Sequence, residues 1–209
     1  MFLGKTEIEA RLDELVEFPD QRDRNTKNIQ AANLDLRVGD EVYVSGDATP
    51  TTLSETNAHI VLKPGQFALV KTFERIKMPS NLVGLISTRY RYKMQGLINI
   101  SGFHVDPNFD GPLFFAVQNV GPNDIRLRFK DEVFMIMWAE VRSADPNLQP
   151  KKGAERITLE QMAQLGGARL TISSLREQIR SMEVQLKIYG GIVVAALVGI
   201  LIQLLRKPG

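Results

Sequence analysis

The sequence predicts a mainly β fold, a sandwich or barrel, with a helical region at its C-terminus. Residues 34–141 consist of short apolar or alternating segments separated by turn residues, with little helical pattern between them. The length of 209 residues suits one domain of about 140 residues plus an appendage. The turn residues that separate the segments include Pro64-Gly65, Gly111-Pro112, Gly121-Pro122 and Lys130-Asp131.

Seven strands are expected in this region. Ile125, Leu127 and Phe129 alternate with Arg126 and Arg128, which is typical of a half-buried strand. The expected strands cover residues 59–62, 66–73, 82–86, 97–101, 113–118, 125–129 and 132–141. A short amphipathic helix is expected before them, from Thr6 to Leu15, with one face formed by Ile8, Leu12 and Leu15.

Composition excludes several classes of site. The chain has no cysteine, so disulfides, thiolate metal sites and the His/Cys zinc sites of zinc deaminases are impossible. Its 2 histidines are too few for a histidine metal cluster. The net charge of +2 gives no argument for nucleic-acid binding, so no nucleic-acid partner is expected. The N-terminus is charged within five residues and has no apolar run, so we expect the first domain to stay in the cytoplasm.

The C-terminal region reads as a linker, a stalk and a membrane anchor. Apolar residues from Ile172 to Tyr189 recur at steps of three and four, which favours a coiled-coil stalk over an amphipathic helix lying on the domain. Residues 188–205 carry no charge and would reach about 27 Å as a helix, which favours a transmembrane helix over a buried one. The expected division is a domain at 1–142, a linker at 143–157, a stalk at 158–187, a transmembrane helix at 188–205 and a tail at 206–209.

Four sequence blocks, in order and with matching spacing, resemble the dCTP deaminase/dUTPase superfamily, in particular its dCTP deaminase-like branch. The first, residues 33–39, resembles the family's xDLR(V/L)G strand, and residues 62–70 are similar to its L-x-P-G-E-x-x-L strand. Residues 79–89 lead into Gly96-Leu97 as the family's phosphate-binding block does. Residues 104–111 resemble the block that ends in I-D-P-G-[WY]-x-G in the deaminases.

The resemblance implies a distorted dUTPase-like β-barrel that assembles as a homotrimer. It also implies sites at subunit contacts that bind a deoxynucleoside triphosphate, with Mg²⁺ held through the phosphates rather than by the protein directly. A trimeric domain would suit a parallel three-stranded stalk. The remaining expected partner is the lipid bilayer, with the N-terminal domain on its cytoplasmic side.

Roles follow from the same resemblance. Asp106 aligns with the carboxylate that orients a water, so it is the candidate catalytic residue; an Asp-Pro turn is the plain alternative. Phe109 aligns with the aromatic that packs on the deoxyribose, and a core aromatic is its alternative. The candidate nucleotide-binding residues are Arg89, Arg91, Phe109, Asn108 and Gly102. Asp35 aligns with an aspartate that is largely structural in the family.

Departures from the pattern affect the chemistry. The deaminases have Ser and a second Arg where this chain has Tyr90 and Met94, and a general acid/base Glu where it has Ala116. The dUTPases have a second Asp where it has Asn108, and a glycine-rich C-terminal arm that this chain lacks. Alanine cannot transfer protons, which removes the central group of the deamination.

Three functions remain open on the sequence. The first is a membrane-anchored module that binds a deoxynucleoside triphosphate, with altered or lost deaminase chemistry. The second is an active enzyme, a dUTPase-like pyrophosphatase or a dCTP deaminase, with the pyrophosphatase favoured of the two. The third is a trimeric membrane scaffold with a non-functional pocket.

Overall fold

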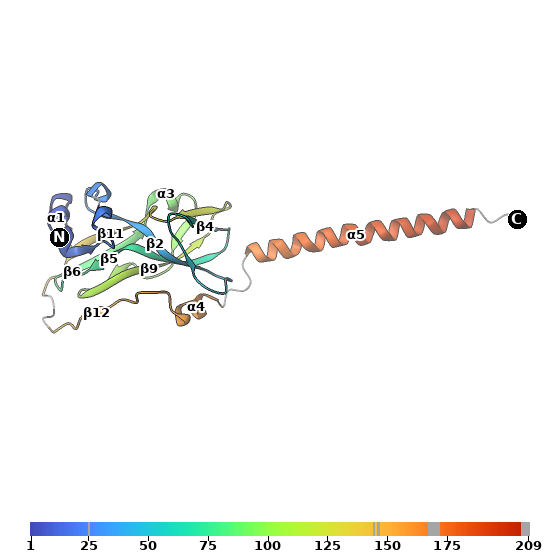
Figure 1. Cartoon of the computed structure of the whole chain (residues 1–209). Coiled ribbons are helices and arrows are strands. Elements are labelled where there is room, and N and C mark those ends of the chain that lie inside the picture. Colours follow the sequence, from blue (N-terminus) through green and yellow to red (C-terminus); the bar gives the residue numbers. More distant parts are fainter. Residues whose placement is uncertain (25, 144, 146, 167–171, 206–209) are drawn as a thin grey trace. The chain divides into compact units, whose positions relative to one another are not determined.

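The computed structural model describes residues 1–24, 26–143, 145, 147–166 and 172–205 (Figure 1). The chain divides into two compact units, Met1–Arg169 and Leu170–Gly209. The strands of the first unit are β1 (Val16–Glu17), β2 (Leu34–Val44), β3 (Thr51–Thr52), β4 (His59–Leu62), β5 (Phe67–Lys77), β6 (Leu82–Thr88), β7 (Leu97–Asn99), β8 (His104–Val105), β9 (Phe109–Asn119), β10 (Ile125–Arg128), β11 (Glu132–Glu140) and β12 (Lys151–Lys152).

Short helices accompany these strands. They are α1 (Lys5–Ala10), α2 (Leu12–Leu15), α3 (Tyr90–Lys93), α4 (Leu159–Gly166) and the 3₁₀ helices η1 (Gln21–Asp23) and η2 (Thr26–Asn28). The predicted N-terminal helix is thus split at Arg11, but Ile8, Leu12 and Leu15 are fully buried, as expected. The mainly β class predicted from the sequence is confirmed.

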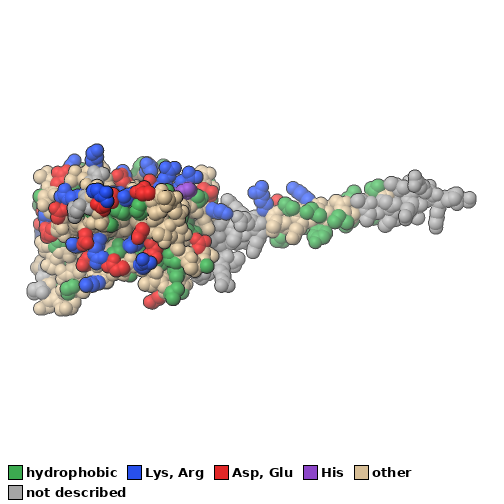
Figure 2. Space-filling model, in the orientation of Figure 1, with side chains coloured by type: hydrophobic (Ala, Val, Ile, Leu, Met, Phe, Trp, Pro, Cys, Tyr) green, Lys and Arg blue, Asp and Glu red, His purple; other side chains and the backbone are tan. Residues whose placement is uncertain are grey.

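Most strands form one curled sheet. Its order is β12-β9-β5-β2-β11-β6-β8, with β1 on β5, β3 on β2 and β7 on β9, while β4 and β10 form a separate antiparallel pair. Alternate residues of the long strands point into one hydrophobic core, where the rings of Phe115 and Phe134 stack with centroids 3.9 Å apart. Figure 2 shows cationic and acidic side chains interspersed over the visible face of this unit, in agreement with the net charge of +2.

One predicted strand break was wrong. Gly111-Pro112 lies inside β9 instead of ending a strand, because the register of β5 against β9 shifts between Lys71 and Arg75. Proline is tolerated at such a bulge, where its missing N–H breaks no regular pair. The Leu113 N–H, displaced from the regular pairing, donates to Thr72 Oγ1 at 2.9 Å.

The predicted linker and the start of the predicted stalk also differ from the structure. Residues 148–165, called the strap below, belong to the first unit and run along β9 at its lower edge in Figure 1. Strand β12 pairs in parallel with Phe109 and Asp110 of β9. Helix α4, expected to begin the stalk, packs Met162 and Leu165 against a cluster on the outer face of the sheet.

The second unit contains helix α5 (Ile172–Leu205). Its described heptad residues Ile179, Met182, Leu186 and Tyr189 are exposed, and the side chains of residues 172 and 175 lie outside the description. Within the part of the chain that the structure describes, no helix is both long and apolar enough to cross a membrane. The predicted transmembrane helix at 188–205 is therefore not supported by the structure. The side chains of residues 195–196 and 199–205 are not described. The predicted tail, 206–209, lies outside the described residues.

Candidate functional site

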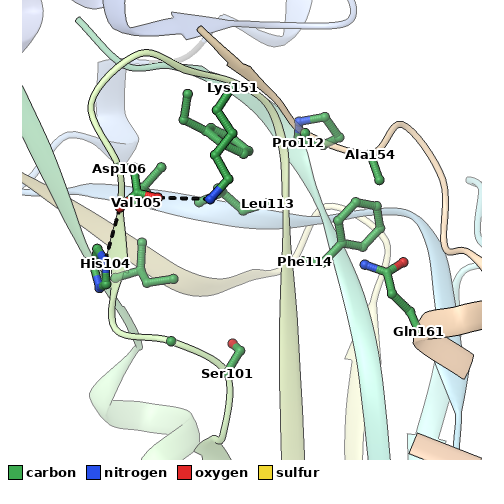
Figure 3. Close-up of a pocket in the computed structure, with 14 residues that line it drawn as sticks. Ser101, His104, Val105, Asp106, Pro112, Leu113, Phe114, Lys151, Ala154 and Gln161 are labelled. Atoms are coloured by element: carbon green, nitrogen blue, oxygen red, sulfur yellow. Dashed lines mark hydrogen bonds and ion pairs between the residues drawn. The ribbon is translucent and has the colours of Figure 1, made fainter. Parts of the chain in front are cut away.

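A cavity of about 280 Å³ lies between β9 and the strap (Figure 3). Two parts of the first unit that are distant in sequence form it. The barrel side is lined by residues of β6, β8, β9 and the loops before and after β8, among them Ile86, Ser101, His104, Asp106, Phe109 and Phe114. The strap side is lined by Lys151, Gly153, Ala154 and Gln161.

Asp106 holds two polar contacts at one end of this cavity. Its Oδ2 accepts a hydrogen bond from Lys151 Nζ at 3.0 Å, and its Oδ1 lies 3.2 Å from His104 Nε2. The hydrogen bond from Lys151 lowers the pKa of Asp106 below its ordinary value, against a smaller opposing effect of burial. Asp106 is therefore ionised at neutral pH, so it can orient a water and accept a proton, although a lowered pKa makes it a weaker base.

Phe109 is half-buried and forms part of the cavity wall where β9 meets the strap. A Cβ on Gly153 would lie 2.7 Å from Phe109 Cζ, so any larger residue at this position would require the strap or the ring to move. The backbone holds the approach as well, since Gly153 N donates to Asp110 O at 2.8 Å. The close packing fixes the ring that the sequence predicted to contact a sugar.

Ala116 does not line this cavity. It lies two residues from Phe114 on the same face of β9 and packs with an apolar cluster. The buried members are Tyr43, Leu69 and Ile157, and the partly buried ones are Phe114, Ala116, Met162 and Leu165. The strap thus covers the position where the resemblance predicts a proton-transferring carboxylate, and it does so with apolar side chains. A charge there would be desolvated among apolar groups.

The predicted nucleotide-binding residues do not all come together. Asp106, Phe109 and Gly102 line the cavity, whereas Asn108 donates from its side chain to Leu148 O at 2.7 Å. Arg91 lies on α3 beside the Tyr92 hydroxyl and lines a separate hollow.

Arg89 is held by carboxylates away from the cavity. It pairs with Glu132, and its Nη2 lies 3.2 Å from Asp35 Oδ2. The Asp35 side chain is only 2% exposed and also accepts hydrogen bonds from Gln30 and Asn33. These contacts hold Asp35 within the fold. Nucleotide binding by Arg89 and Arg91 stays a prediction.

Sequence reasoning missed four polar residues that line the cavity. Ser101 and His104 belong to the segment before Asp106, whereas Lys151 and Gln161 fall in the parts read as linker and stalk. The apolar spacing of Ile157, Met162 and Leu165 was the available signal that this part packs on the barrel.

The cavity offers one carboxylate, Asp106, to a metal ion. Among the described residues, no group of three His, Cys, Asp or Glu side chains is placed to hold one. Mg²⁺ is commonly held by one or two carboxylates together with substrate phosphates and water. The residues present therefore fit a magnesium ion that arrives with phosphates, and not one held by the protein alone.

Comparisons with known proteins agree with the fold and the sequence blocks. A family model described as dCTP deaminase-like matches residues 2–141. A dCTP deaminase of Pyrococcus abyssi is 30% identical over 135 residues, which cover 64% of this chain and 85% of that protein. A protein of Methanosphaera stadtmanae named "dCTP deaminase, dUMP-forming" is 26% identical over 136 residues, which cover 57% of this chain and 69% of that one.

A solved structure shows the same fold. The 2′-deoxycytidine 5′-triphosphate deaminase from Agrobacterium tumefaciens superimposes with a TM-score of 0.57 at 17% identity. The match covers 68% of this chain and 49% of that one, so the chain spans about half of that structure's length. The fold and the sequence match together define the class, and the chain belongs to the dCTP deaminase-like family.

Proposed function

We propose that this chain is an enzyme of nucleotide metabolism that binds a deoxynucleoside triphosphate and acts at its phosphates rather than at its base. The observation that carries the proposal is the contrast between the surroundings of Asp106 and those of Ala116. Asp106 is an ionised carboxylate in a cavity with Phe109, whereas Ala116 is an apolar residue under the strap. The carboxylate suited to activating water is present, and the one needed for deamination is replaced.

The comparisons favour an enzyme over a purely binding or scaffolding module, because the relatives are named as enzymes. One relative's name gives dUMP as its product. Conversion of dCTP to dUMP removes an amino group and also releases two phosphates. A family member that has lost its deaminating carboxylate can therefore retain phosphate chemistry.

The proposed reaction is hydrolysis between the α- and β-phosphates. Asp106 accepts a proton from water, the water oxygen bonds to the α-phosphorus, and the bond to the bridging oxygen breaks, which releases pyrophosphate. Magnesium, bound through the phosphates, would neutralise charge on them. Phe109 packs on the deoxyribose and leaves no space for a 2′-hydroxyl.

The first test is ligand binding by the full-length chain. Each deoxy- and ribonucleoside triphosphate is added with Mg²⁺ and the thermal unfolding midpoint is measured. A ligand that binds only the folded state raises its stability by about 2.7 kcal/mol at a hundredfold excess over Kd. We expect a deoxynucleotide to raise the midpoint and the matching ribonucleotide to raise it less, with the difference lost in Phe109→Ala. An unchanged midpoint with every nucleotide would reject the proposal.

Membrane attachment and trimerisation are proposals from the sequence. The charge-free run 188–205 supports a single membrane anchor, and the heptad spacing supports a trimeric stalk. We expect the full-length chain to sediment with membranes and to resist carbonate washing, and light scattering in detergent to give a trimer. Recovery in the supernatant without detergent would reject the anchor, and a monomer in detergent would reject the stalk.

A further inference from the structure

A second hollow, of about 340 Å³, lies between α3 and β10 and shares no lining residue with the cavity beside β9. Three arginines line it, Arg91 of α3 and Arg126 and Arg128 of β10. The other lining residues are polar or charged as well: Tyr92, Gln95, Asp124 and Asp131. Figure 2 shows Lys and Arg side chains gathered over α3, at the top of the first unit in this view. The hollow is a cationic site separate from the candidate functional site.

The sequence of β10 places two of these arginines on the same face of the strand. Ile125 and Leu127 are buried in the core, so Arg126 and Arg128 both point outward and are exposed. At about 3.3 Å per residue, the two positions lie about 7 Å apart. Positive charges at this spacing repel each other, and an anion bound between them removes the repulsion.

The fold does not use the guanidinium groups of Arg126 and Arg128. Within the part of the chain that the structure describes, neither side chain makes a hydrogen bond or an ion pair. Arg91 donates one N–H to the Tyr92 hydroxyl at 3.0 Å and has further N–H groups to offer. The Asp131 carboxylate is engaged by the fold, since its Oδ2 accepts from the Tyr92 hydroxyl at 3.3 Å and from Arg128 N at 3.2 Å. With three arginines and two aspartates, the hollow keeps a positive charge and unused donors.

The donor set selects a phosphate-type anion. A guanidinium binds phosphate oxygens through two parallel N–H bonds, which a single ammonium cannot do. Arginines from two elements can engage more than one phosphate at a time. This arrangement favours an anion with several charges over a phosphodiester, which carries one.

We propose that the hollow between α3 and β10 is a second ligand site, which binds a free polyphosphate such as pyrophosphate through Arg126 and Arg128, with Arg91 as a third ligand. The site does not depend on nucleotide binding at the cavity beside β9, because the two share no residue.

Calorimetric titration of the full-length chain with pyrophosphate, in a neutral detergent and without Mg²⁺, tests the site. Arg126→Gln/Arg128→Gln should weaken pyrophosphate binding by about tenfold or more, because charge-assisted hydrogen bonds are lost. Arg126→Lys/Arg128→Lys keeps both charges without the two-point geometry, so its affinity should lie between those of the wild type and the glutamine variant. The unfolding midpoint without ligand should be the same in all three proteins, since the core residues of β10 are unchanged.

Arg142→Gln/Arg156→Gln is the matched control. It removes the same charge from two exposed arginines that lie outside the hollow, and it should leave the affinity within about twofold. An equal loss in this control would show that only net charge matters and would overturn the proposal.

Three further results would overturn the proposal. The first is wild-type that does not bind pyrophosphate. The second is a loss of binding in Lys151→Met but not in Arg126→Gln/Arg128→Gln, which would place pyrophosphate in the cavity beside β9. The third is displacement of pyrophosphate by detergent micelles that contain phosphatidylglycerol but not by detergent alone, which would assign the hollow to a lipid headgroup instead of a free polyphosphate.

Discussion

Arg37→Met should lower the free energy of unfolding by about 3–5 kcal/mol, because it leaves a buried carboxylate without its partner. Arg37 of β2 donates to Glu74 of β5 from Nε at 2.6 Å and from its backbone N at 2.8 Å. The two side chains are 9% and 1% exposed, so water cannot replace the lost partner. The Arg37 guanidinium also lies 4.6 Å from the Phe73 ring centroid and donates to Asp23 O.

Urea unfolding of the full-length variants measures this effect. Arg24→Met is the control, since Arg24 pairs with Asp13 on the surface and should contribute less than about 1 kcal/mol. The double variant Arg37→Met/Glu74→Leu should recover much of the loss, because both charges are then absent from the core. If Arg37→Met is no less stable than Arg24→Met, the pair does not contribute to stability.

The sequence predicted the elements with regular periodicity and missed those that form through the backbone. Strand β10 and the buried face of the N-terminal helix follow from alternation and helical spacing. Strand β12 pairs Lys151 and Lys152 with β9 through main-chain groups, so no side-chain pattern marks it. No pattern in the sequence marks the irregular pairing at Pro112 of β9 either, because it depends on a shift of register in the partner strand β5.

The candidate site was predicted only in part, because contacts that form only in the folded chain leave no pattern in the sequence. The resemblance identified Asp106, Phe109 and Gly102, and the structure places all three at one cavity. It assigned phosphate binding to Arg89 from residue type, but the availability of a guanidinium depends on its partners. Glu132 and Asp35 are distant in sequence from Arg89, and only the fold brings them to it. The wall formed by the strap lies beyond the region of resemblance altogether.

The replacement of the deaminating carboxylate predicts a separation of activities. We expect no detectable formation of dUTP from dCTP, because Ala116 cannot transfer protons and the partly buried groups that pack around it are apolar. Hydrolysis of a deoxynucleoside triphosphate to the monophosphate and pyrophosphate should persist with Mg²⁺. Chromatographic separation of the products from dCTP and dUTP measures both reactions in one experiment. Robust deamination would mean that another group transfers the protons.

Asp106→Asn should reduce this hydrolysis by about 10²–10⁴-fold while leaving nucleotide affinity nearly unchanged, because the amide keeps the shape of the side chain but cannot accept the proton of water. The pH profile gives a second readout. The lowered pKa of Asp106 keeps the wild type active until the pH falls through that pKa, below the ordinary range of aspartate. Lys151→Met removes the largest cause of the lowering, so the acid limb should move to higher pH. Lys152→Met is the matched control, because Lys152 is the neighbouring exposed residue of β12 and does not line the cavity, and it should leave the limb in place. Wild-type turnover in Asp106→Asn, or an acid limb that Lys151→Met does not move, would show that Asp106 is not the base.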